Sequence, residues 1–255
     1  MYGRSGSHNR IWLPALAAGG LILFLALRFS PGGAPEQYTL LPGSEMEVPV
    51  YVQRGGRDGP TVYVVGGTHG DETAGWQAAA ELRRTKPEAG TLYVAAPLNA
   101  YGAEHNQRKT REERDLNRNF PGNPEGCDAE RIAWAVYQDI QEKDPDLVLD
   151  LHEAKPPEGT RDDLRGSLIC QDMRPVADLI LDLLEEFGTD SRPLTLYGSP
   201  PQGSLNRTVT EQLGIPVITI ETGRDEALSS RVRQQLDIVE FTLTRYGMRS
   251  EQGAS

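Results

Sequence analysis

Short apolar runs alternate with amphipathic segments along most of the chain, and this alternation limits the fold more than any other feature. The runs are rich in valine, isoleucine and leucine, so we predict strands at residues 46–52, 61–65, 91–96, 147–152, 167–170 and 216–221. Apolar residues recur with helical period between them, which predicts helices at residues 72–84, 128–143, 174–187 and 231–246. The pattern favours an α/β domain with a mostly parallel mixed sheet between helical layers.

The N-terminal part of the chain differs in composition from the rest. Arg4 and Arg10 precede an apolar run, and a Pro- and Gly-rich stretch follows it. The run has the length of a short membrane-spanning helix rather than of a signal-peptide core. Following the positive-inside rule, we predict four segments: a cytoplasmic N-terminus (residues 1–10), an uncleaved signal-anchor helix (11–28), a linker (29–36) and a domain outside the membrane. Cleavage would instead release a secreted protein.

We predict one catalytic domain at residues 37–247, followed by a disordered tail at residues 248–255. A chain of 255 residues is long enough to bury one substantial core. Its 37 acidic residues outnumber its 26 basic residues, and this balance does not favour nucleic acid as a partner. Cys127 and Cys170 are too few for a thiolate zinc site, and they could form a disulfide or remain two buried thiols.

The segment GGTHGDE joins a predicted strand to a predicted helix and carries His69 and Glu72 three residues apart. Loops at the carboxyl ends of parallel strands form the ligand crevice of such sheets. An imidazole and a carboxylate at this spacing can bind one cation. They could also only cap the helix and interact with its dipole, so a third ligand is needed to favour a metal site.

His152 is the best candidate for the third ligand because it ends another apolar run. Two histidines and one glutamate form the ligand set of many catalytic zinc sites, which keep a fourth position for water. We therefore predict one Zn²⁺ ion bound by His69, Glu72 and His152. Asp150 could orient one of the imidazoles or only form a hydrogen bond at the strand end. We interpret His105 as a solvated loop histidine.

A basic cluster, RKTREERDLNRNFPG, lies within a polar stretch at residues 99–125 that we predict to be a long loop. Arginine guanidinium groups bind carboxylates through two hydrogen bonds, and asparagine amides add a further donor. Asn117 and Arg118 are therefore candidates for binding an anionic group of a substrate. The other cations of the cluster could form a solvated run that neighbouring acids neutralise.

Glu221 ends a further apolar run in the segment TIETG. Burying a carboxylate there is costly unless the group is paired or has a function. Near a bound water molecule, this carboxylate could accept a proton and later deliver it to a leaving amine. The structural alternative is an ion pair with Arg224.

The segments GGTHGDE, DLNRNF, LDLHE and TIETG resemble, in order and spacing, the succinylglutamate desuccinylase/aspartoacylase group of the zinc carboxypeptidase superfamily. The resemblance covers residues 47–245 and implies a three-layer α/β/α fold like that of zinc carboxypeptidases. It implies zinc ligation by His69, Glu72 and His152, binding of a substrate carboxylate by Asn117 and Arg118, and catalysis by the Glu221 carboxylate.

The family also uses an upstream arginine to polarise the scissile carbonyl. Arg111 lies nearest the expected position and is our prediction, with Arg108 as its rival and as a further substrate-binding residue. Tyr197 is near, but displaced from, the position of the tyrosine that closes over peptides in the carboxypeptidases. The C-terminal β domain of the cytosolic deacylases has no evident counterpart, so we expect an open site.

We predict a zinc-dependent hydrolase that cleaves an amide or ester bond in a carboxylate-bearing small molecule or peptide. The first alternative is a membrane-anchored metallocarboxypeptidase that acts on peptides such as those of the cell wall. The second alternative, of a different class, is a zinc-binding domain without turnover. In each case we expect the N-terminal helix to make the membrane a partner.

Overall fold

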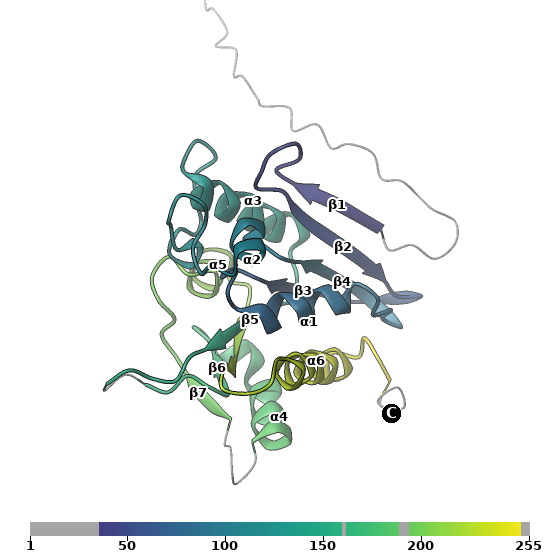
Figure 1. Cartoon of the computed structure of the whole chain (residues 1–255). Helices are drawn as coiled ribbons and strands as arrows, with labels where there is room; N and C mark the ends of the chain where they lie inside the picture. The colour runs from purple at the N-terminus through teal and green to yellow at the C-terminus, as the bar shows by residue number, and fades with distance from the viewer. Residues whose placement is uncertain (1–35, 160–161, 189–193, 251–255) are drawn as a thin grey trace, which may run out of the picture.

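A computed structural model describes residues 36–159, 162–188 and 194–250, which fold around one eight-stranded sheet (Figure 1). The strand order is β1-β2-β4-β3-β5-β8-β6-β7. The strands are β1 (Glu36–Leu40), β2 (Val48–Arg54), β3 (Arg57–Gly66), β4 (Ala89–Ala95), β5 (Leu147–Ala154), β6 (Ser167–Ile169), β7 (Thr195–Tyr197) and β8 (Val217–Gly223). The central strands β4, β3, β5 and β8 run parallel, whereas β1, β2 and the β6-β7 pair join antiparallel. The predicted mixed, mostly parallel sheet is confirmed.

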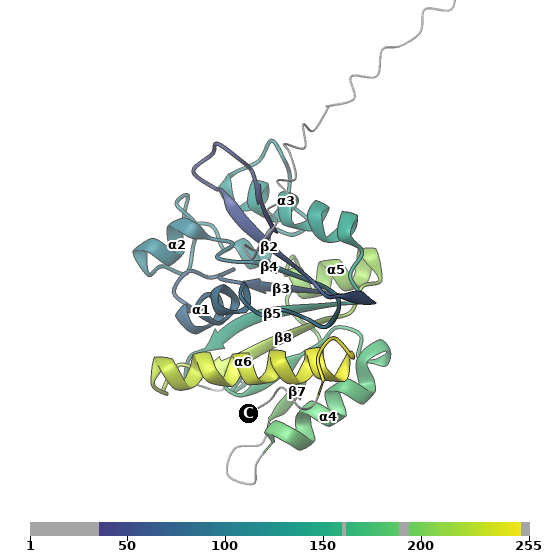
Figure 2. The ribbon, with the colours of Figure 1, turned by 90° about the vertical axis from the view of Figure 1, so that its right-hand side faces the viewer.

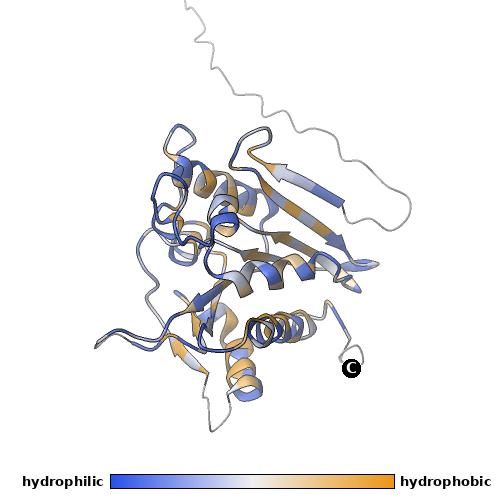
Figure 3. Cartoon of the chain, in the orientation of Figure 1, coloured by the Kyte–Doolittle hydropathy of each residue, from blue (hydrophilic) through white to orange (hydrophobic). Residues whose placement is uncertain are grey.

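Helices cover both faces of the sheet (Figure 2). One core joins the sheet to α1 (Thr73–Leu82), α4 (Ala177–Phe187) and α6 (Leu228–Arg245). The other core joins it to α3 (Asp128–Lys143) and α5 (Leu205–Leu213). Successive side chains of a strand point to opposite faces, so Val62 and Val64 of β3 belong to the first core and Tyr63 and Val65 to the second. Figure 3 shows the apolar segments gathered at these interfaces.

Several short elements were missed in the sequence. The predicted loop at residues 99–125 contains α2 (Ala100–His105) and the 3-10 helix η1 (Leu116–Arg118). Helix α2 has no apolar stripe, and it is started by the Asn99 side chain, which accepts a hydrogen bond from the Gly102 N–H. His105 therefore lies on a helix, where it is exposed and stacked on Tyr101. Strands β1 and β7 and helix α5 were also not predicted, and a second 3-10 helix, η2 (Arg174–Val176), precedes α4.

The ordered domain extends beyond both predicted limits. Strand β1 begins at Glu36, inside the predicted linker. At the other end Met248 is fully buried, and its carbonyl accepts a hydrogen bond of 2.7 Å from the Glu88 N–H, so the residue belongs to the domain and not to a tail. Cys127 and Cys170 are both free thiols.

The predicted membrane helix at residues 11–28 lies outside the described residues. Within residues 36–159, 162–188 and 194–250, no helix combines the length and the apolar character needed to cross a membrane.

The carboxyl ends of β3, β5 and β8 lie side by side at one edge of the sheet. These strands are neighbours and parallel, and His152 of β5 is the register partner of Glu221 of β8. Between β3 and α1 the chain turns at Gly67, whose φ of 75° favours glycine. A Cβ atom on Gly66 would lie 2.7 Å from the Gly75 carbonyl oxygen, so glycine lets α1 start directly against β3. The topology thereby brings the ends of three strands together.

Candidate metal centre and active site

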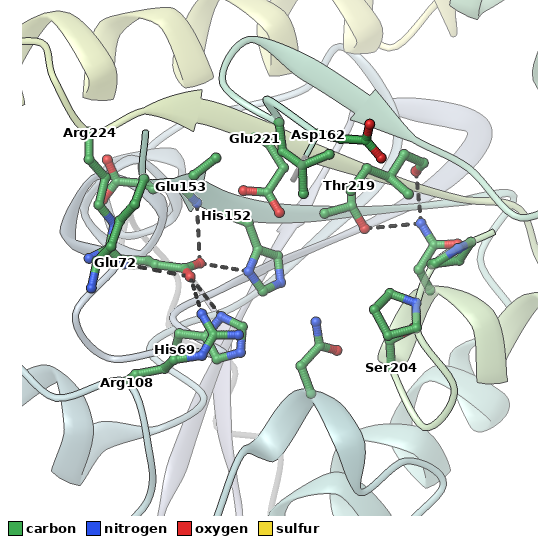
Figure 4. Close-up of a pocket in the computed structure, with 18 of the residues that line it drawn as sticks. His69, Glu72, Arg108, His152, Glu153, Asp162, Ser204, Thr219, Glu221 and Arg224 are labelled. Atoms are coloured by element: carbon green, nitrogen blue, oxygen red, sulfur yellow. Dashed lines mark hydrogen bonds and ion pairs between the residues drawn. The ribbon is translucent and has the colours of Figure 1, made fainter. Parts of the chain in front are cut away.

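Three buried side chains converge at this edge of the sheet (Figure 4). Glu72 lies between two imidazoles: its Oε1 is 2.7 Å from His69 Nδ1, and its Oε2 is 2.6 Å from His152 Nδ1. Taking one potential ligand atom from each of the three residues, all three atoms lie within 4.8 Å of one another, and each residue is at most 3% exposed. The structure therefore brings together the three residues predicted to bind zinc.

The far nitrogen of each imidazole contacts a second carboxylate. His152 Nε2 lies 3.1 Å from Asp150 Oδ2, and His69 Nε2 lies 3.0 Å from Asp115 Oδ1. A carboxylate at one ring nitrogen fixes the tautomer and leaves the other nitrogen free to bind a metal. For Asp150 the sequence left two roles open, the orientation of an imidazole or a hydrogen bond at the strand end. Asp115 was missed because it looked like one more acid within a charge run.

Mutual attraction controls the ionisation of this cluster. Burial opposes ionisation of Glu72, but the two imidazoles outweigh burial and hold its pKa well below the ordinary value. Burial likewise opposes the charge of His152, but Asp150 and Glu72 raise its pKa well above the ordinary value. Burial also opposes the charge of Asp115, yet its contact with His69 and the nearby Arg108 lower its pKa. The Glu72 and Asp115 carboxylates thus stay ionised and attract a cation.

This donor set fits zinc. Two imidazole Nδ1 atoms and one carboxylate are typical zinc ligands, and three protein ligands leave a position open for water or substrate. The outer carboxylates Asp115 and Asp150 hold both rings in the orientation that ligation requires. His69, Glu72 and His152 would therefore hold the ion.

Glu221 faces the same cavity beside His152 (Figure 4). Within the described part of the chain its carboxylate has no hydrogen bond or ion pair, and burial raises its pKa to about 7. The alternative ion pair with Arg224 is absent, because the Arg224 Nη1 donates a 2.9 Å hydrogen bond to Asp71 Oδ2 and its Nη2 lies 3.6 Å from Glu72 Oε1. An unpaired carboxylate with a pKa near neutrality has the properties of a general base.

Asn117 and Arg118 lie in η1 and line the cavity. The Asn117 Oδ1 accepts a 2.9 Å hydrogen bond from the Leu205 N–H, so its amide nitrogen is left for a ligand. The Arg118 Nη1 donates a 2.7 Å hydrogen bond to the Asn117 backbone carbonyl, which restrains the guanidinium. Asp115 begins η1 by accepting a hydrogen bond from the Asn117 N–H, so one acid orients both His69 and this segment.

Arg111 does not line this cavity, which corrects its predicted position. Its guanidinium is paired with Glu45 and lies 5.6 Å from the Tyr101 ring centroid, on a separate cavity. Arg108, the rival, does line the catalytic cavity: its Nη1 donates to Glu72 Oε1 at 3.1 Å and its Nη2 to Asp115 Oδ2 at 3.3 Å.

The fold of the loop explains this difference. The buried Asp128 carboxylate accepts hydrogen bonds from the Thr110 hydroxyl at 2.6 Å and from the Glu112 N–H at 2.9 Å. These bonds fix the backbone on either side of Arg111 against the start of α3. The Arg111 side chain consequently points away from the metal centre.

The cavity has a volume of about 470 Å³ and mixed charge. Its cationic lining residues are Arg108, Arg118, Lys155 and Arg224, and its acidic ones are Glu72, Glu153, Glu158, Asp162 and Glu221. Figure 4 shows Thr219 and Ser204 on the side away from His69, with Asp162 above them. Tyr197 is not among the lining residues, and its hydroxyl donates to the Asp163 carbonyl at 3.2 Å.

A mixed α/β/α sheet with a His-Glu-His centre at the carboxyl ends of its parallel strands defines a protein of the zinc carboxypeptidase-like superfamily. Residues 58–246 match the model of the succinylglutamate desuccinylase/aspartoacylase catalytic domain. The chain belongs to this family, which confirms the resemblance inferred from its motifs.

Known relatives agree with this assignment. The chain is 32% identical over 135 residues to the N-alpha-acetyl-L-2,4-diaminobutyric acid deacetylase of Halomonas elongata, a match that covers 49% of this chain and 39% of that relative. An aspartoacylase family protein from Mesorhizobium loti has a similar fold, with a TM-score of 0.67 at 23% identity over 88% of this chain and 71% of that one. The ectoine utilization protein EutE (DoeB) from Ruegeria pomeroyi also has a TM-score of 0.67, at 21% identity over 85% and 68% of the two chains.

Proposed function

We propose that this protein is a zinc-dependent hydrolase that removes the acyl group from an N-acylated amino acid. The observation that carries the proposal is the unpaired Glu221 carboxylate beside the His-Glu-His centre. A site built only to hold zinc has no use for a half-buried carboxylate without a partner, because desolvation of such a group is costly. Family membership supports the same conclusion.

Each residue around the cavity has a separate role in the proposed reaction. Zinc, when bound, supplies Lewis acidity at the scissile carbonyl and at the attacking water. Glu221 accepts the proton of that water and passes it to the nitrogen of the leaving amine. Arg108 donates hydrogen bonds toward the oxygen on which negative charge develops. We assign this role to Arg108 rather than Arg111 because only Arg108 reaches the cavity.

The carboxylate of the amino acid would bind to Asn117 and Arg118. A free amide nitrogen and a guanidinium that line the same cavity can both donate hydrogen bonds to the oxygens of a carboxylate. This pair favours substrates that carry a carboxylate next to the scissile amide. Esters of the same shape would bind in the same way.

The side chain of the amino acid would lie toward Asp162. This carboxylate lines the cavity, and no ion pair holds it within the described residues. At the same end the Asn206 amide nitrogen already donates to the Ile169 carbonyl and the Thr219 hydroxyl, so it is not free for an anionic side chain. A cationic side chain is therefore favoured, and the Halomonas relative is named for the deacetylation of N-alpha-acetyl-L-2,4-diaminobutyric acid, an amino acid of that kind.

Product release from a defined substrate panel tests the proposal. The panel contains N-acetyl-diaminobutyrate, N-acetylaspartate, N-succinylglutamate and short peptides with free C-termini, incubated with the zinc-loaded protein and with Glu221→Gln. We expect release of the free amino acid from an N-acyl substrate by the wild type alone. Release only from peptide C-termini would favour the carboxypeptidase alternative, and zinc binding without any turnover would favour a binding domain.

We also propose, from the sequence alone, that residues 11–28 anchor this domain outside a membrane. Fractionation of cells that express the full chain would place it in the membrane fraction, and added protease would digest the domain in intact spheroplasts. A full-length chain in the soluble fraction would contradict the anchor.

A further inference from the structure

Helix α1 starts at a zinc ligand but carries no side-chain cap of its own. Glu72 is the N-cap residue, and its carboxylate turns toward the two imidazoles instead of toward the helix. The first N–H groups of a helix need partners from outside the helix. The Glu153 Oε2 supplies one by accepting a 2.8 Å hydrogen bond from the Ala74 N–H.

The contact between these two segments is reciprocal. The Glu153 N–H donates to Glu72 Oε2 at 3.2 Å (Figure 4). The Glu153 carboxylate accepts from the first turn of α1. Two such bonds reproduce the arrangement of a capping box, but across segments that are 81 residues apart in the chain. Because Glu153 directly follows His152, this pairing ties one zinc ligand to the other.

The Glu153 carboxylate is in turn held by α6. Its side chain is 0% exposed, and its second oxygen forms an ion pair with the Arg231 guanidinium. One turn later on the same helix, Gln235 donates to the His152 carbonyl at 2.8 Å and to the Thr222 hydroxyl at 3.0 Å. Helix α6 therefore contacts the ends of both β5 and β8, the strands that carry His152 and Glu221.

We propose that Glu153, fixed by Arg231, is a positioning residue that sets the place of Glu72 relative to His152. This inference rests on the zinc ligation proposed above. An ion pair this deeply buried adds little stability over apolar residues of the same size, because desolvation of both charges offsets their attraction. Its effect is on geometry: without the Glu153 carboxylate, the Ala74 N–H loses its acceptor and the start of α1 loses its fixed distance to β5, while only the backbone bond from the Glu153 N–H to Glu72 remains.

The test replaces the buried pair by apolar residues and measures zinc affinity. The double variant Glu153→Met with Arg231→Met leaves no uncompensated charge but takes the acceptor from the buried Ala74 N–H, so its urea midpoint without metal should fall only modestly. We expect its zinc affinity, measured by competition with a chromophoric chelator, to fall about 10- to 100-fold. The control is Arg233→Met with Asp237→Met, which removes an exposed ion pair from the same helix and should leave zinc affinity unchanged.

A conservative variant separates positioning from a general loss of stability. Glu153→Gln keeps an oxygen that accepts from the Ala74 N–H, so it should retain zinc affinity within about threefold of the wild type. If the double variant does not fold, a fall of more than about tenfold in the zinc affinity of Glu153→Gln would overturn the positioning role, because this variant keeps the acceptor for the Ala74 N–H. Equal zinc affinity in the wild type and a folded double variant would overturn it as well. Absence of zinc binding by the wild type would instead refute the metal centre itself.

Discussion

Replacing Glu221 by glutamine should stabilise the metal-free protein above neutral pH while removing its activity. Burial raises the pKa of the Glu221 carboxyl from its ordinary value of 4.5 to about 7. The folded protein therefore binds this proton more tightly than the unfolded chain does. As pH rises from 4.5 to 7, the free energy of unfolding falls, and above pH 7 the full cost of the buried charge is present. Glutamine cannot ionise and avoids that cost.

The size of the effect follows from the two pKa values. Their difference of about 2.5, at roughly 1.4 kcal/mol for each pKa unit, gives an upper limit of about 3 to 4 kcal/mol. The carboxylate lines a cavity that water enters, which reduces the cost of its charge. We therefore expect Glu221→Gln to exceed the wild type by about 1 to 3 kcal/mol in free energy of unfolding at pH 8. Near pH 4 the difference should be close to zero.

Urea unfolding of both proteins, with chelator present, measures this difference. Titrating groups away from the site are common to the two proteins, so they cancel in the comparison at each pH. A difference that stays constant between pH 4 and pH 8 would refute the raised pKa of Glu221. In the zinc-loaded state the same variant should keep its metal and lose turnover by about 100- to 10,000-fold. Retention of full activity would refute its role as the base.

Four further results are expected. Arg108→Met should lower kcat by about 100- to 1,000-fold, whereas Arg111→Met should lower it less than about twofold; the reverse order in steady-state kinetics would restore Arg111 as the polarising residue. Arg118→Met should raise KM about 10- to 100-fold for carboxylate substrates and leave KM for the matching amides unchanged. Asp162→Asn should reduce the ratio of kcat/KM for N-acetyl-diaminobutyrate to kcat/KM for N-acetyl-norvaline by about two- to fivefold, the effect expected of an exposed ion pair. An unchanged ratio would exclude a contact between Asp162 and the cationic side chain of the substrate. Turnover should rise with pH as Glu221 ionises, with a midpoint below about 7 because bound zinc favours the carboxylate, and a rate that falls across this range would contradict the base.

The His69, Glu72 and His152 cluster could be predicted because strand ends are visible in the sequence. The apolar runs that end at His152 and Glu221 are uninterrupted, and the observed strands Leu147–Ala154 and Val217–Gly223 match them within two residues. Neighbouring parallel strands place their carboxyl ends at the same edge of the sheet. The convergence of these side chains therefore follows from strand pairing alone. His69 and Glu72 follow the same rule at the end of β3.

The second layer of the site could not be predicted in this way. Asp115 reaches His69 from 46 residues away, and its position depends on the path of a loop that has no apolar period. The choice between Arg108 and Arg111 likewise depends on hydrogen bonds from Thr110 and Glu112 to Asp128. Contacts of this kind join side chains to backbone groups in irregular segments, and periodicity carries no information about them.

Zinc stoichiometry and affinity of the domain from Glu36 onward test the central claim most directly. Elemental analysis after purification without chelators, followed by zinc titration of the stripped protein, should give one tightly bound ion per chain. His152→Ala should lose that ion, whereas His105→Ala should keep it, because only His152 belongs to the buried cluster. No stoichiometric zinc in the wild type, or equal binding by the two variants, would contradict the account.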